Sequence, residues 1–164
     1  MLRNTLMILL TITITLLTPA PGLAEGAQET SEPATKVLVN TDKNGLALRG
    51  YDPVAYFTNN EPAKGSKKHT SVYRGATYRF ASAEHKAIFD ADPEKYEPQF
   101  GGFCGYAASI NKVSPINVRY FQIIDGRLIL QHNRKAWDLW NQDVPGNIEK
   151  ADQNWPQLEE KFGV

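Results

Sequence analysis

The segment Phe121–Leu130 constrains the fold most, because its pattern is typical of a β-hairpin. Asp125-Gly126 lies at its centre and is a dipeptide preferred in two-residue type I′ turns. Apolar residues alternate with others on both sides of this turn. A second hairpin is expected over Ser71–Phe80, around Gly75. Antiparallel sheets commonly pack one face on a core, so other elements must cover these hairpins.

Short helices are expected to provide that cover. Ser82 is expected to cap a helix in which His85, Ile88 and Phe89 share one apolar face, because they fall at positions i, i+3 and i+4. A further helix is expected over Arg134–Gln142. His85 therefore points toward the core of the domain rather than into solvent.

Further expectations concern the two ends of the domain. Val37–Val39 and the alternating Leu46 and Leu48 are expected to form short strands. Pro145-Gly146-Asn147 is expected to break the helical pattern, and Pro156 to open a final helical turn. No internal repeat is visible in the sequence. These patterns together predict an α+β fold of small antiparallel β-hairpins packed with short helices.

Residues 1–24 have the features of a secretory signal peptide. Arg3 provides the positive charge, Leu6–Leu17 the apolar region, and Gly22-Leu23-Ala24 the small residues of a cleavage site. The apolar region is too short to cross a bilayer of roughly 30 Å. We therefore expect an exported protein, periplasmic if the source is a Gram-negative bacterium, with no stable membrane span after cleavage.

The mature chain is expected to have a flexible polar linker over residues 25–36 and a single domain over residues 37–164. The sequence contains 18 Lys and Arg residues against 18 Asp and Glu residues, so general attraction to nucleic acid is not expected. Cys104 is the only cysteine, which excludes an intrachain disulfide and a multi-cysteine zinc site. An unpaired thiol is unusual in an oxidising export compartment.

Several blocks resemble the YHS domain: GYDPVAYF at residues 50–57, YRGATYRFAS at 73–82 and DPEKY at 92–96. The block PQFGGFCGYA at 98–107, with Asn-Trp-Pro at 154–156, resembles the longer exported proteins that carry this domain. The resemblance implies a single YHS-type domain. It also implies an association with metal handling, because short members accompany heavy-metal transporters and often use cysteine ligands.

The cysteine positions of the short members are occupied here by Ala55, Ala81 and His85. Cys104 is an additional thiol that those members lack. A thiolate and an imidazole suit copper(I), which is satisfied by two or three ligands, better than a closed zinc site, which needs four. We therefore expect a soft metal ion, copper before zinc, bound by Cys104 with help from His85. His132, which follows the last hairpin strand, is a further histidine within possible reach of a site.

Two alternatives remain open. One is an interaction domain without metal, which binds a protein partner or an apolar small molecule through its aromatic residues. The other is thiol chemistry at Cys104, either a mixed disulfide or a disulfide-linked dimer. A Cys-His catalytic pair lacks an orienting third group that spacing identifies, so a binding role is expected rather than catalysis.

Overall fold

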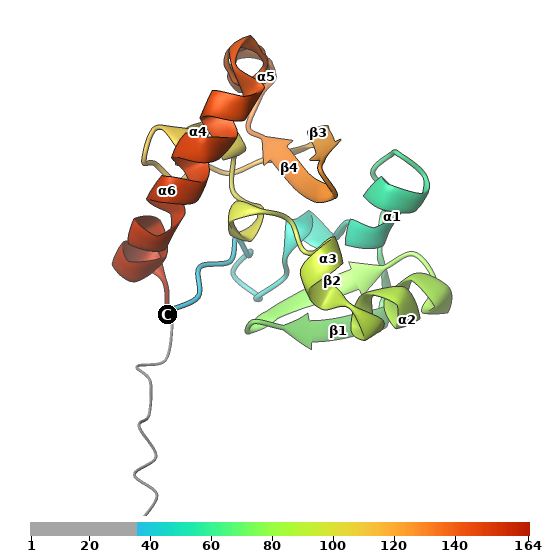
Figure 1. The fold of residues 1–164 in the computed structure, drawn as a ribbon. Coiled ribbons are helices and arrows are strands. Elements are labelled where there is room, and N and C mark those ends of the chain that lie inside the picture. Colours follow the sequence, from blue (N-terminus) through green and yellow to red (C-terminus); the bar gives the residue numbers. More distant parts are fainter. Residues whose placement is uncertain (1–35) are drawn as a thin grey trace, which may run out of the picture. The chain divides into compact units, whose positions relative to one another are not determined.

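The computed structural model of the protein describes residues 36–164 (Figure 1). The predicted signal peptide, and the predicted linker apart from Lys36, lie outside the described residues. The strands are β1 (Ser66–Tyr73), β2 (Ala76–Phe80), β3 (Asn117–Ile124) and β4 (Arg127–Gln131). The helices are η1 (Leu48–Gly50), α1 (Pro53–Thr58), α2 (Ala83–Ala91), α3 (Pro93–Tyr96), η2 (Phe100–Gly102), α4 (Gly105–Ser109), α5 (Arg134–Gln142) and α6 (Val144–Phe162).

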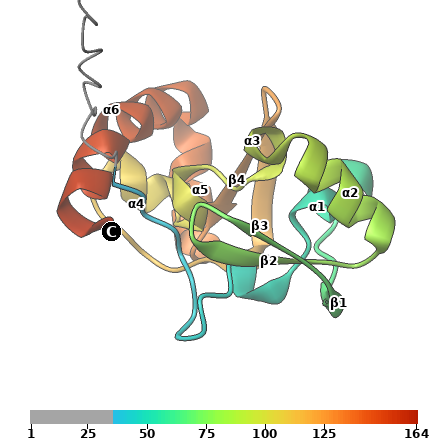
Figure 2. The ribbon, with the colours of Figure 1, turned by 90° about the horizontal axis from the view of Figure 1, so that it is seen from below.

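Both hairpins form as predicted and confirm the α+β class. β1 pairs with β2 and β3 with β4, each pair antiparallel. The turns are Arg74-Gly75 and Asp125-Gly126, and φ is positive at all four residues, as a type I′ turn requires. Helix α2 packs beside the first hairpin, and α3 contacts both α2 and β4. Helices α4 and α5 pack beside the second hairpin, and α6 packs against both of them (Figures 1 and 2).

The order of elements in residues 47–92 occurs again in residues 99–143, and we call these the first and second units. Each unit contains a 3₁₀ turn, a short helix, a hairpin with strands of 8 and 5 residues, and a helix of 9 residues. The expectation of a chain without an internal repeat is therefore wrong for the backbone. The repeat escapes sequence inspection because the side chains at matching positions differ.

The backbone hydrogen bonds of the two units also correspond. The Ala47 amide donates to the Thr77 carbonyl at 2.9 Å, and the Gln99 amide donates to the Leu128 carbonyl at 2.8 Å. Both hairpins shift register near the start of their first strand. Asp92 and Asp143 end the 9-residue helices with nearly identical backbone angles, φ −155° and ψ 74° against φ −153° and ψ 75°. The two units are therefore built by the same local rules.

Several predictions about the ends of the domain are wrong. Val37–Val39 forms no strand, and Leu48 lies in η1 rather than in a strand. Pro145-Gly146-Asn147 does not break the helical pattern, because Asp143 caps α6 and Pro145 occupies its first turn, where a proline costs no hydrogen bond. Helix α6 also continues through Pro156 instead of restarting there.

The two ends of the described chain meet. Val37 and Val164 exchange backbone hydrogen bonds of 3.1 Å, which places the C-terminus beside the start of the described chain (Figure 1). Trp140 is fully buried against the apolar face of α6, whose Ala151 and Leu158 lie in the same cluster. Between residues 36 and 164, no helix has both the length and the hydrophobicity needed to cross a membrane.

Candidate functional site

Asp52 organises the site in the first unit. Its carboxylate caps α1 and accepts hydrogen bonds from the amides of Val54 at 2.9 Å and Ala55 at 3.4 Å. It also accepts one from the amide of Ala81, at 2.8 Å, which precedes α2. The side chain is 0% exposed. Asp52 is therefore the N-cap of α1, and its carboxylate also connects α1 to the end of β2.

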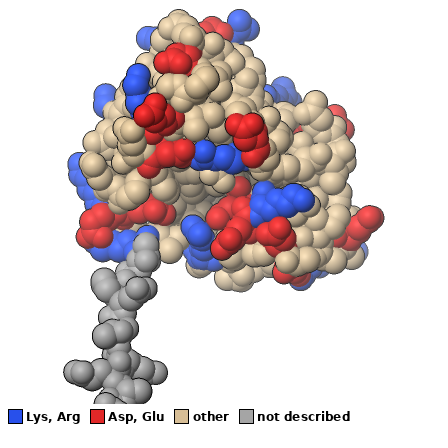
Figure 3. Space-filling model, in the orientation of Figure 1, with Lys and Arg blue, Asp and Glu red and all other residues tan. Residues whose placement is uncertain are grey.

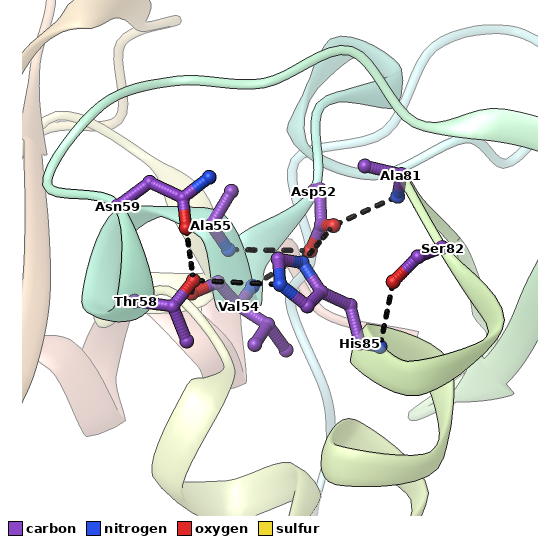
Figure 4. A network of polar contacts seen from close by, with 8 residues as sticks. All are labelled: Asp52, Val54, Ala55, Thr58, Asn59, Ala81, Ser82 and His85. Atoms are coloured by element: carbon purple, nitrogen blue, oxygen red, sulfur yellow. Dashed lines mark hydrogen bonds and ion pairs between the residues drawn. The ribbon is translucent and has the colours of Figure 1, made fainter.

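His85 provides the fourth contact of this carboxylate. Its Nδ1 lies 2.6 Å from Asp52 Oδ2, and its Nε2 lies 3.5 Å from Thr58 Oγ1 (Figure 4). Because a carboxylate only accepts, Nδ1 carries the proton that is donated in this contact. The inward orientation predicted for His85 is confirmed, since only 16% of its side chain is exposed.

A carboxylate that accepts from one ring nitrogen is a common support for a metal-binding histidine. The neighbouring positions, however, offer no further donor side chain, because Ala55 and Ala81 stand where short YHS members have cysteines. Among residues 36–164, no three His, Cys, Asp or Glu side chains are grouped so that they could hold a metal ion. The Asp52–His85 pair is therefore suited to holding α1, α2 and β2 together.

Cys104 occupies the matching place in the second unit, where it is the N-cap residue of α4. It is 1% exposed, and its Sγ donates to Gln131 Oε1 at 3.2 Å. The same oxygen accepts the Tyr106 amide at 3.0 Å. Gln131 is also 1% exposed, and its Nε2 has no hydrogen-bond partner among the described residues. The sequence did not predict that Gln131 contacts Cys104, because only the tertiary structure brings the end of β4 next to the thiol.

The electrostatic setting of the thiol follows from this position. Burial raises the pKa of Cys104 above its ordinary value, and this effect exceeds the opposing effect of three amides. Those amides belong to Ala107, His132 and Tyr106, and they are the second-unit equivalents of the amides that Asp52 binds. The thiol therefore occupies a place that, in the first unit, is built for a carboxylate.

The units differ most in the residue that faces this position. The first helical residues of α2 and α5 correspond, which places Ala136 where the first unit has His85. A hollow of about 350 Å³ lies there, and we call it the thiol hollow. Its lining includes Cys104, Tyr106, Ala107, Ile110, His132 and Ala136. The loss of an imidazole in the second unit thus coincides with an open space next to the only thiol.

The two predicted metal ligands lie in different units and share no partner. His85 contacts Asp52 and Thr58, whereas Cys104 contacts Gln131. His132, not His85, is the histidine that lines the thiol hollow, and its Nδ1 donates to the Pro115 carbonyl at 2.9 Å. The sequence spacing of His85 and Cys104 did not show that they belong to different units, because the repeat of the two units is visible only in the backbone structure.

Residues 54–99 match the family model of the YHS domain. The chain carries a YHS domain. No curated protein and no solved structure matches the chain. The matched part of the YHS domain covers most of the first unit and includes Ala55, Ala81 and His85, while Cys104 lies beyond it in the second unit. The match therefore includes His85 but begins two residues after Asp52, and Cys104 of the thiol hollow lies in the chain that follows it.

Proposed function

We propose that this protein is exported and binds a soft metal ion, copper(I), at Cys104. The observation that carries the proposal is the position of Cys104, the only thiol of the chain, next to the thiol hollow that His132 also lines. The YHS domain supports it further, because the resemblance associates this domain with metal handling. The signal-peptide features of residues 1–24 support export.

The second copper ligand is an imidazole. Copper(I) accepts two or three ligands, and imidazole suits it. His132 supports the proposal more strongly than His85, because His132 lines the thiol hollow while His85 lies in the first unit against Asp52 and Thr58. Ala136 leaves room beside the sulfur, so the hollow has space for a metal ion and for an imidazole that approaches it.

The burial of the thiol defines how copper must bind. The thiolate is the form that binds metal, and the raised pKa of Cys104 means that copper has to displace a proton. The side chain is 1% exposed, so the rim of the hollow has to open for the ion to enter. Ile110 lines the hollow and is 47% exposed, so it has no close packing that would keep it from moving aside.

The test is a copper(I) titration against a chromophoric competitor, with elemental mass analysis of protein purified from the export compartment. We expect Cys104→Ser to lower the affinity by orders of magnitude and His132→Gln to lower it by about tenfold or more. Ala136→His restores the imidazole of the first unit beside the thiol and should raise the affinity. His85→Gln is the matched control and should leave the affinity of the folded protein unchanged. Equal copper retention by Cys104→Ser would refute the proposal.

The second candidate is an interaction domain in which Cys104 has only a structural role. The hydrogen bond from Sγ to Gln131 and the 1% exposure favour it, because a buried thiol with a raised pKa is usually unreactive. This candidate predicts a metal-free protein after copper loading and a thiol that labelling reagents modify only on unfolding. The same burial speaks against a disulfide-linked dimer, which needs an accessible sulfur.

A further inference from the structure

We propose that a second hollow, separate from the thiol hollow, binds a small organic anion with two or more carboxylate or phosphate groups. This basic hollow has a volume of about 640 Å³. Arg49, Tyr51 and Lys64 of the first unit line it together with Arg119 and His132 of the second unit. Buried apolar residues of the segment 116–118 complete its wall. The basic hollow shares His132 with the thiol hollow, but neither the YHS domain match nor the proposed copper site assigns a role to Arg49, Lys64 or Arg119.

The charge of the basic hollow is not compensated. Among the described residues, no acidic side chain lines it. Within residues 36–164, Arg49, Lys64 and Arg119 take part in no ion pair. On the face drawn in Figure 3, several basic side chains lie next to acidic ones, and the whole chain has no net charge. Basic residues gathered in a concave site therefore attract an anion at a place where the protein supplies none.

Contacts within the hollow hold two of the cations in position. Lys64 Nζ donates to the Arg49 carbonyl at 3.3 Å and lies 4.3 Å from the centre of the Tyr51 ring. Arg49 Nη1 donates to the Ile116 carbonyl at 3.3 Å. Each cation keeps further N–H donors beyond these contacts, since a guanidinium has five and an ammonium has three. The donors are thus oriented before a ligand arrives, which lowers the entropic cost of binding.

The backbone at Arg49 is strained for an arginine. Its φ is 54°, in the left-handed region, and the matching position of the second unit is Gly101, also with φ 54°. A residue with a Cβ is strained in that conformation, whereas glycine is not. The first unit therefore keeps a long basic side chain where a glycine would be more stable. Leu48 and its counterpart Phe100 also have positive φ, at 50° and 54°, so the strain belongs to the turn and does not by itself indicate binding.

The chemistry of the lining defines the ligand class. Arginine side chains bind carboxylate and phosphate groups through paired hydrogen bonds. Arg49 and Arg119 come from different units, so a ligand that contacts both needs two anionic groups or one group with several oxygens. The volume of about 640 Å³ falls in the range of small-molecule sites. Carboxylate and phosphate compounds share this chemistry, and the experiment below distinguishes between the two by comparing their affinities.

The experiment is calorimetric titration of the purified, metal-free protein at low salt with pyrophosphate, citrate and inorganic phosphate. We expect pyrophosphate or citrate to bind with a dissociation constant below about 1 mM, and the better of the two decides between phosphate and carboxylate. Arg119→Gln should weaken binding about tenfold, and its side chain has no hydrogen-bond partner among the described residues whose loss would disturb folding. Lys64→Gln should have a similar effect.

Lys150→Gln is the matched control, because this exposed lysine of α6 lies outside the basic hollow. It should leave the affinity unchanged. The proposal is overturned if none of the three anions binds at concentrations up to about 10 mM, or if Lys150→Gln weakens binding as much as Arg119→Gln does. Cys104→Ser should bind the anion like the natural protein, so this outcome is independent of the copper titration.

Discussion

Replacing Asp52 by alanine tests whether this carboxylate is the main polar anchor of the first unit. It is 0% exposed and accepts four hydrogen bonds, from the amides of Val54, Ala55 and Ala81 and from His85 Nδ1. A hydrogen bond to a charged group contributes about 1.5–3 kcal/mol, and a helix N-cap by itself contributes about 1 kcal/mol. The bonds to Ala81 and His85 are the shortest and lie outside the cap. We expect Asp52→Ala to lower the free energy of unfolding by about 4 kcal/mol in urea denaturation.

The matched control for this prediction is Asp143→Ala. Asp143 also caps a helix, α6, but it is exposed and its side chain accepts a single bond, from the Gly146 amide at 3.0 Å. This variant should lose about 1 kcal/mol. Asp52→Ser keeps a capping oxygen but loses the reach to His85, so its loss should lie between the two alanine variants. If Asp52→Ala loses no more than Asp143→Ala, the carboxylate acts only as a cap and the reasoning is refuted.

Three further predictions follow from single contacts. Gly105→Ala should lower the free energy of unfolding by about 1–3 kcal/mol in the same assay, because a Cβ there would lie 2.7 Å from Ile129 Cγ2. An unchanged free energy of unfolding would show that Ile129 in β4 can shift without cost to accommodate the added methyl group. In metal-free protein, Ala136→His should place an imidazole beside the sulfur and slow labelling of Cys104 in partly destabilising urea. Unchanged labelling would show that reagents do not reach the sulfur past residue 136. Burial raises the pKa of Glu97 from 4.5 to about 6, so its protonation favours folding, and this contribution is complete below about pH 4.5 and lost as the pH rises through 6. The melting temperature of the natural protein relative to Glu97→Gln should therefore be higher at pH 4.5 than at pH 7, and a pH-independent difference would contradict the shift.

Local patterns predicted the elements whose formation depends on neighbouring residues. Asp125-Gly126 specified a turn because its residues tolerate positive φ, and Ser82 specified a helix start because its hydroxyl accepts the His85 amide. The helix break was misplaced because Pro145 is compatible with a first helical turn, and the sequence alone does not show that Asp143 is the cap. The strand expected at Val37–Val39 failed because an isolated alternation forms a strand only beside a partner.

The sequence by itself determined the hairpins, the short helices, the inward orientation of His85 and the presence of a single thiol. These depend on turn geometry, capping and periodicity, which act over a few residues. The tertiary structure alone decided that His85 binds Asp52, that Cys104 donates to Gln131, and that Ala136 leaves a hollow beside the sulfur. It also revealed that one backbone plan is used twice. The physical reason is that the repeated backbone hydrogen bonds are formed by amides and carbonyls, which nearly every residue carries whatever its side chain. The chemistry of a site depends instead on side chains that are distant in sequence and meet only in the folded chain.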